Sequence, residues 1–203
     1  MNNKVIYTVI GLILGIVGTF FVYPSIVKNN TSMMSEKVTH ASGTLDAHFI
    51  EQMIPHHEDA ITMAKLAQTK AQRPEVKRLA DNIIVSQGQE IAQMKSWYKS
   101  WFGRELPTGD QVMQHHGMMS SNSSMHMGMM GTDQDMDKLS KATDFDTAFV
   151  EEMIPHHQMA VMMASMLKDG TQRSEMKKLA EDIITAQTNE IEQMRAWLTE
   201  WSK

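Results

Sequence analysis

The sequence predicts an all-α protein made of two repeated helical hairpins that form a four-helix arrangement. The first observation is an internal repeat: residues 46–101 align without a gap with residues 146–201, and 26 of the 56 aligned positions are identical. The second is apolar spacing of three and four residues along both halves of each copy, which is typical of amphipathic helices. One hairpin cannot bury its apolar face alone, so the two hairpins are expected to pack together, or each with its counterpart in another chain.

The N-terminal segment, residues 1–27, is predicted to be a membrane anchor or a signal segment. It contains Val5–Tyr23, a run of 19 residues without a charge, close to the ~20 residues that a helix needs to cross a bilayer. A signal peptide has a shorter apolar core and an A-x-A-like cleavage site, which is not found here. We therefore expect an uncleaved transmembrane helix rather than a cleaved signal, followed by a polar spacer over residues 28–43.

The two repeats are predicted to occupy residues 44–103 and 144–203. In the first, helices are expected over 45–69 and 74–102, and in the second over 145–168 and 174–202. Pro74 suits a first helical position, Gly103 suits the end of a helix, and Gly170 suits a C-terminal cap.

Between the repeats, residues 104–143 are rich in Met, His, Ser and Gly and show no periodic apolar face. This composition predicts a flexible linker. Such a density of soft ligands indicates that the linker can wrap metal ions without a preformed fold. The linker ligands are Met113, His115, His116, Met118, Met119, Met125, His126, Met127, Met129 and Met130.

The string Met-Ile-Pro-His-His occurs once in each repeat, on the first predicted helix. At the helical period, Met53, His56 and His57 share one stripe with Met63 and several alanines. Pro55 points the opposite way. An interior proline costs a helix about 3 kcal/mol or more, and both copies keep it directly beside the histidine pair.

The second predicted helix of each repeat carries Gln87 and Glu90, or their counterparts, inside an otherwise apolar stripe. Buried polar groups need partners, and the histidines across the hairpin are the expected ones. A metal-bound histidine usually gives its other ring N–H to a carboxylate or carbonyl. The predicted metal ligands are Met53, His56, His57, Met63, Met94, Met153, His156, His157, Met163 and Met194, supported by Gln87, Glu90, Gln187 and Glu190.

The composition points to copper as the bound metal. The chain has 21 Met and 9 His but no Cys. Thioethers are soft ligands that select Cu(I), and imidazole suits both copper states and zinc. We expect Cu(I), Cu(II) or both to bind, with silver as a mimic.

Enzymatic and nucleic-acid functions find little support in the sequence. His57-Glu58 begins an HExxH-like string, but Ile61 stands where the second histidine should be. No nucleophile–base pair is found, so we expect a protein that is not an enzyme. The net charge of −5 provides no basic field for nucleic acid.

The motifs F-x-x-x-M-I-P-H-H-x-x-A-x-x-M-A and Q-x-x-E-I-x-x-M-x-x-W, present in both repeats, resemble the bacterial family called domain of unknown function 305. The resemblance implies a ferritin-like helical fold. The tandem arrangement with a Met/His-rich middle resembles a periplasmic copper-binding member of that family. It implies metal ligands at Met53, His56, His57 and Met94 with their counterparts, extracytoplasmic copper binding and a role in copper tolerance.

The leading hypothesis is a membrane-tethered protein that sequesters or transfers copper outside the cytoplasm, in the periplasm or at the cell surface. Its partners are metal ions, the membrane, and a copper exporter or another copper carrier. Two alternatives are a methionine-based oxidant sink and a structural helical adaptor without metal. A cuprous oxidase is a weaker option.

Overall fold

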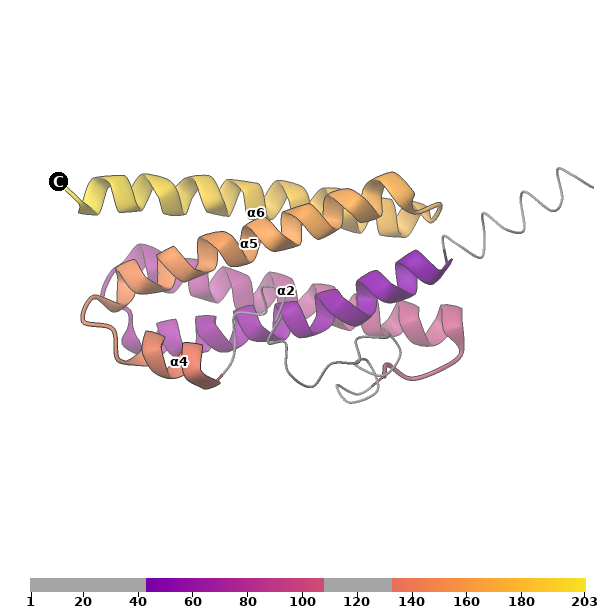
Figure 1. Ribbon diagram of the computed structural model, residues 1–203, viewed down its shortest axis with the longest axis horizontal. Coiled ribbons are helices and arrows are strands. Elements are labelled where there is room, and N and C mark those ends of the chain that lie inside the picture. The colour runs from indigo at the N-terminus through magenta and orange to yellow at the C-terminus, as the bar shows by residue number, and fades with distance from the viewer. Residues whose placement is uncertain (1–42, 108–132) are drawn as a thin grey trace, which may run out of the picture. The chain divides into compact units, whose positions relative to one another are not determined.

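The computed structural model describes residues 43–107 and 133–203. Its helices are residues 43–70, α2 (Pro74–Phe102), α4 (Asp133–Ser140), α5 (Phe145–Gly170) and α6 (Ser174–Trp201) (Figure 1). The described part of the chain contains no strand, so the all-helical prediction is confirmed. The four predicted helices agree with the observed ones to within two residues at each end.

The predicted N-terminal helix and most of the Met/His-rich linker lie outside the described residues. None of the helices within the described ranges is long and apolar enough to cross a bilayer. The described residues from Thr44 to Lys203 belong to one compact unit.

The core consists of two apolar clusters, each built from all four long helices and from both repeats. One joins the second half of helix 43–70 and the start of α2 to the start of α5 and the end of α6. The other joins the opposite halves of the same helices. Each cluster therefore needs both hairpins, and the hairpins pair within one chain.

The short helix α4 corrects part of the linker prediction. It lies inside the segment 104–143 that the sequence predicts to be a flexible loop. Leu139 is buried in the first apolar cluster and Met136 packs against it. Two apolar side chains spaced three residues apart are enough to hold one helical face on the bundle, although they are too few to show a periodic pattern.

The glycines at the helix ends behave differently from each other. Gly103 adopts a left-handed conformation (φ 63°) and its N–H bonds to the Lys99 carbonyl, so it caps α2 as predicted. Gly170 is instead the last residue of α5, and the cap is Thr171. A Cβ at Gly170 would lie 2.5 Å from a methyl carbon of Leu45. A larger residue there would have to displace the end of the flexible Leu45 side chain, so close packing favours glycine at this position without requiring it.

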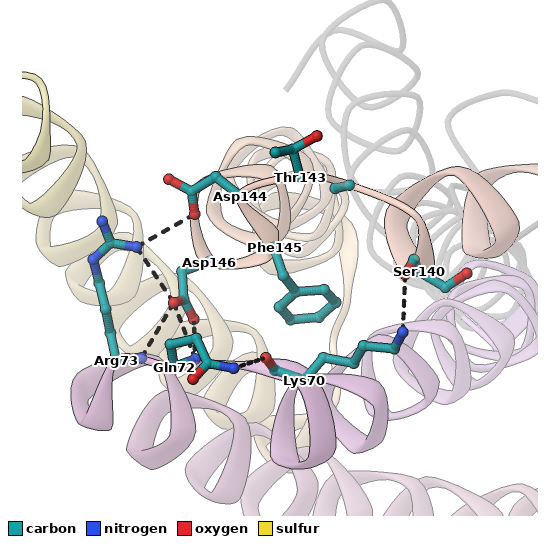
Figure 2. A pocket seen from close by; sticks show the side chains of 9 residues that line it. Lys70, Gln72, Arg73, Ser140, Thr143, Asp144, Phe145 and Asp146 are labelled. Carbon is teal, nitrogen blue, oxygen red and sulfur yellow. Dashed lines mark hydrogen bonds and ion pairs between the residues drawn. The ribbon is translucent and has the colours of Figure 1, made fainter.

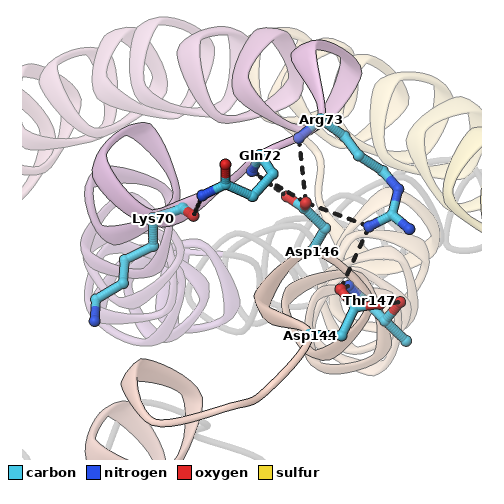
Figure 3. A network of polar contacts seen from close by, with 6 residues as sticks. All are labelled: Lys70, Gln72, Arg73, Asp144, Asp146 and Thr147. Carbon is cyan, nitrogen blue, oxygen red and sulfur yellow. Dashed lines mark hydrogen bonds and ion pairs between the residues drawn. The ribbon is translucent and has the colours of Figure 1, made fainter.

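Asp146 ties the second repeat to the first at one end of the bundle (Figure 3). Its carboxylate accepts hydrogen bonds from the backbone N–H groups of Gln72 (3.0 Å) and Arg73 (3.1 Å), just before α2 begins. Because α2 has no side-chain cap of its own, Asp146 supplies a negative charge at its N-terminus from the other repeat. The Arg73 guanidinium adds an ion pair to Asp146 and lies 4.1 Å from the Trp201 ring centre.

The opposite end of the bundle repeats this joint with a different hydrogen-bonding pattern. Arg173 Nε lies 3.2 Å from Asp46 Oδ2, and the Arg173 guanidinium lies 4.2 Å from the Trp101 ring centre. Here the backbone N–H of Arg173 bonds to the Thr171 hydroxyl and not to the aspartate. Burial raises the pKa of Asp46, against the opposing effects of Thr171 and Arg173.

Candidate metal centre

A polar layer crosses the middle of the bundle, between the two apolar clusters. We call His57 and His157 the outer histidines; each lies against a glutamate on the other helix of its own hairpin. His57 Nε2 lies 2.6 Å from Glu90 Oε2, and His157 Nε2 lies 2.7 Å from Glu190 Oε2. Both imidazoles are fully buried, whereas each carboxylate keeps about a fifth of its surface exposed. The structure thus brings together the histidines and glutamates that the sequence predicts to meet.

The inner histidines meet across the two repeats. The ring centres of His56 and His156 are 3.8 Å apart, with the planes inclined at 41°. Each inner ring lies 6.3 Å from the outer ring of its own helix. The two Met-Ile-Pro-His-His strings therefore place their histidines in one central cluster and not in two separate ones, which the sequence alone does not reveal.

The prolines lie beside this layer without ending their helices. The helices continue through Pro55 and Pro155. Pro155 is exposed and Pro55 half-buried, whereas the histidines that follow them are buried. The prolines thus face away from the site, as the helical period predicts.

The layer contains buried polar atoms that have no hydrogen-bond partner within the described residues. They are both ring nitrogens of His56 and His156, Nδ1 of His57 and His157, and Oε1 of Gln87 and Gln187. Buried polar atoms are normally satisfied, and an exception calls for an explanation such as a bound ion or water. The partner that the sequence predicts for the two glutamine oxygens is not found. The exceptions concentrate on imidazole nitrogens, which are common metal ligands.

Burial keeps the inner histidines neutral. Desolvation, followed by the neighbouring histidines, lowers the pKa of His56 to about 3 and the pKa of His156 to about 2. A backbone contact with the opposite inner histidine raises the pKa of each ring, but this is the smallest of the contributions. At neutral pH each inner ring therefore carries a lone pair that can bind a metal ion. If the outer ring donates Nε2–H to its glutamate, its Nδ1 also carries a lone pair.

Buried thioethers lie on both sides of the histidine layer. Met53 and Met94 belong to one apolar cluster, and Met163 of the other repeat packs against it. Met153 and Met194 belong to the other cluster, together with Met63. Each cluster therefore holds predicted thioether ligands from both repeats. Met176 in one cluster and Met136 against the other are further thioethers that the sequence does not predict as ligands.

The described residues contain no group of three or more His, Asp or Glu side chains that could already hold a metal ion. An ion in the layer would need thioethers or a turned imidazole to complete its coordination. Mixed imidazole and thioether ligation suits Cu(I), a soft ion. The donor types present fit copper, and Glu90 and Glu190 are placed to orient the outer rings.

The predicted linker ligands, from Met113 to Met130, lie outside the described residues, so the structure leaves them as predictions. The sequence reasoning missed the aspartate–arginine joints at the two ends. A signal for them was present, because Asp46 and Arg73 recur as Asp146 and Arg173 at the repeat spacing.

A shallow cavity of about 370 Å³ lies near the Asp146 joint, away from the histidine layer (Figure 2). Its polar groups largely bond to each other: Lys70 Nζ donates to the Ser140 carbonyl at 3.0 Å, and Arg73 pairs with Asp144 at 3.3 Å. This cavity belongs to a structural joint, and its side chains are not the soft donors found in the layer.

Comparison with known proteins places this geometry in context. The structure resembles CopM in its Cu(II)-bound form, with 50% sequence identity, a TM-score of 0.66, and coverage of 77% of this chain and 97% of CopM. CopM in its Cu(I)-bound form is 47% identical, with a TM-score of 0.64 and coverage of 78% and 98%. CopM has also been solved in Ag-bound forms. A DUF305 protein from Streptomyces coelicolor is 26% identical, with a TM-score of 0.64 and coverage of 77% and 93%.

An uncharacterized protein of Acanthamoeba polyphaga mimivirus is 45% identical over 51 residues, which is 25% of this chain. The chain spans about a third of that relative's length (34%). The family model described as "Domain of unknown function (DUF305)" matches residues 46–198, both repeats and the layer between them. The chain, with its tandem histidine strings and shared helical fold, belongs to the DUF305 family.

Proposed function

We propose that this protein binds copper in the central histidine layer and sequesters or transfers it, without catalysing a reaction. The observation that carries the proposal is the set of six unpartnered, buried imidazole nitrogens at one level of the bundle. Leaving such a group unsatisfied costs about 1–3 kcal/mol. A purely structural role for the histidines would not explain this cost, whereas a bound ion would use the lone pairs.

Copper is favoured over other metals by the chemistry of the donors. The chain offers imidazoles and thioethers and has no thiol. Hard cations prefer carboxylates and carbonyls, but the carboxylates of the layer are already bonded to histidines. CopM, which shares half of the aligned residues, is known in Cu(I)-, Cu(II)- and Ag-bound forms.

The location and partners belong to the same proposal. The uncharged run Val5–Tyr23 would tether the helical unit to a membrane, with the unit outside the cytoplasm. The Met/His-rich linker would then add capacity, and a copper exporter or another carrier would exchange ions with the protein. A contribution to copper tolerance follows from such sequestration.

The test is a Cu(I) competition titration of the full chain beside a variant in which the ten linker Met and His residues are replaced. We expect the variant to lose part of the capacity but to keep tightly bound copper in the layer. Copper should also raise the variant's melting temperature, because a ligand at 100 times its Kd stabilises the folded state by about 2.7 kcal/mol. A linker variant that binds no copper would show that the histidine layer is only scaffold.

A further inference from the structure

An exposed methionine face on α5 is not explained by packing. Within the described ranges, the large apolar side chains that are mostly exposed are Val85, Met162 (51%) and Met166 (66%). Two of these three lie four residues apart on the same helix. Such residues are neighbours on a helix surface, so the exposure forms a local thioether patch.

Two less exposed methionines extend this patch toward the core. At the helical period, Met162, Met166, Met159 and Met163 fall in this order across an arc of about 100° on α5. Met159 and Met163 are both half-buried, and Met163 packs against an apolar cluster. Met159 is three residues from Met162 and four from Met163, and Met166 is four from Met162 and three from Met163; such spacings place Cβ atoms roughly 5–6 Å apart. We call these four residues the α5 methionine ladder.

The buried end of the ladder adjoins the histidine layer. His156 precedes Met159 by three residues. Around the helix axis of α5, its angular position lies about 20° beyond that of Met163. The His156 side chain is almost fully buried, at 1% exposed, and both of its ring nitrogens lack a partner. Soft donors therefore run along one helix from solvent to an unpartnered imidazole.

The first repeat lacks this feature. The positions that match Met159, Met162 and Met166 are Asp59, Thr62 and Leu66, and only Met63 is shared. Thr62 bonds back to the Glu58 carbonyl at 2.9 Å. The family motif, shared by both repeats, therefore does not account for the ladder.

We propose that the α5 methionine ladder is a second, external site for soft monovalent cations, Cu(I) or Ag(I), from which ions enter the histidine layer beside His156. This inference rests on the proposed copper function. Thioether ligands select Cu(I). Thioethers carry no proton to lose, so the site binds at any pH at which the protein is folded. Cation and thioether associate and dissociate without any redox step.

The experiment uses the full chain labelled with ¹³C at the methionine ε-methyl groups, titrated with Ag(I) and followed by NMR. We expect the signals of Met162 and Met166 to shift at the first additions. The variant Met159→Leu/Met162→Leu/Met166→Leu should bind one ion fewer per chain and fill the histidine layer more slowly. Leucine keeps a similar volume, so the fold should be preserved. Met136→Leu, which removes a thioether outside the ladder, is the matched control.

Three results would overturn the inference. The ladder signals could stay fixed while other sites fill, or the variant could bind as many ions as the control at the same rate. The variant could also change only the oligomeric state, and the face would then be a contact with a second copy. Each differs from failure of the proposed function, in which Ag(I) leaves the histidine layer unchanged in every variant.

The first repeat offers a gain-of-function test. The variant Asp59→Met/Thr62→Met/Leu66→Met copies the ladder onto helix 43–70, where Met63 is already present. It should bind one additional Ag(I) per chain. An unchanged stoichiometry in a folded variant would contradict the proposal that this spacing of thioethers is sufficient.

Discussion

Buried polar groups in the Asp146 joint and in the central histidine layer differ in whether they have hydrogen-bond partners. At the Asp146 joint, a buried carboxylate accepts from two backbone N–H groups and pairs with Arg73. In the central layer, the ring nitrogens of His56 and His156 have no well-aligned hydrogen-bond partner in the described part of the chain. At the Asp146 joint, satisfied polar groups hold the repeats together, whereas the unpartnered ring nitrogens of the layer are available to a ligand. Lack of a partner alone does not mark a ligand site, because both carboxylate oxygens of Asp46 at the other joint also have no well-aligned hydrogen-bond partner among the described residues.

The largest effect is expected from removing the inner histidines. In the variant His56→Phe/His156→Phe, the copper affinity of the layer should fall by more than about 100-fold. Removing a residue that only supports a metal ligand lowers affinity by roughly 10–100-fold, and here the ligands themselves are removed. The metal-free variant should be as stable as the parent or more stable, because it no longer buries unsatisfied nitrogens. Competition titration and thermal unfolding measure the two effects.

A large fall in the stability of the metal-free variant would contradict this separation of roles. Since phenylalanine is slightly larger than histidine, the pair His56→Leu/His156→Leu serves as the second variant. Loss of stability in both would assign the inner rings to the architecture.

A smaller effect is expected at the glutamates that hold the outer histidines. Glu90→Gln/Glu190→Gln keeps the shape of the side chains but removes the charge that favours Nε2–H donation from His57 and His157. Copper affinity should fall by roughly 10–100-fold, as for other supporting partners of metal ligands. The affinity is measured by competition with a chelator at fixed pH. An unchanged affinity would mean that the outer rings do not bind the ion.

Sequence reasoning predicted what depends on spacing along one helix. The helix bounds, the His57–Glu90 meeting and the outward position of Pro55 all follow from the 3.6-residue period and from a hairpin that brings its two helices together. The contact between His56 and His156 does not follow, because the period fixes a residue's face but not the helix opposite it. The Gly170–Leu45 approach was missed for the same reason, and α4 was missed because its two apolar residues are too few to show a period.

At the Asp146 joint we expect a loss of stability without a loss of copper. Asp146→Asn weakens the charge-assisted bonds to the start of α2, and a hydrogen bond to a charged group contributes about 1.5–3 kcal/mol. Denaturant unfolding should show a decrease of that order, with the copper stoichiometry unchanged. Asp137→Asn is the matched control, because within the described residues the Asp137 side chain forms only an exposed i,i+4 pair with Lys141. A parallel loss of copper would mean that joint and layer are not independent.

The smallest change in stability is expected for Asp46→Asn at the other joint, where the substitution should stabilise the protein and not destabilise it. Asp46 is fully buried, and its pKa is raised above 3.8 chiefly by that burial. The ionised carboxylate is therefore less favourable in the folded than in the unfolded state. Its contribution to stability is fully present below the unfolded pKa and is lost as the pH rises through the raised folded pKa. Asp46→Asn cannot ionise, so it should match or exceed the parent at neutral pH.

The pH dependence sharpens this comparison of the two joints. The stability of Asp46→Asn relative to the parent should increase as the pH rises from below about 3.8, the ordinary value for the carboxyl, toward neutrality. Denaturant unfolding at a series of pH values measures this difference. If the asparagine variant instead becomes less stable than the parent with rising pH, the Arg173 ion pair outweighs desolvation. The two joints would then stabilise the bundle in the same way, despite their different hydrogen bonds.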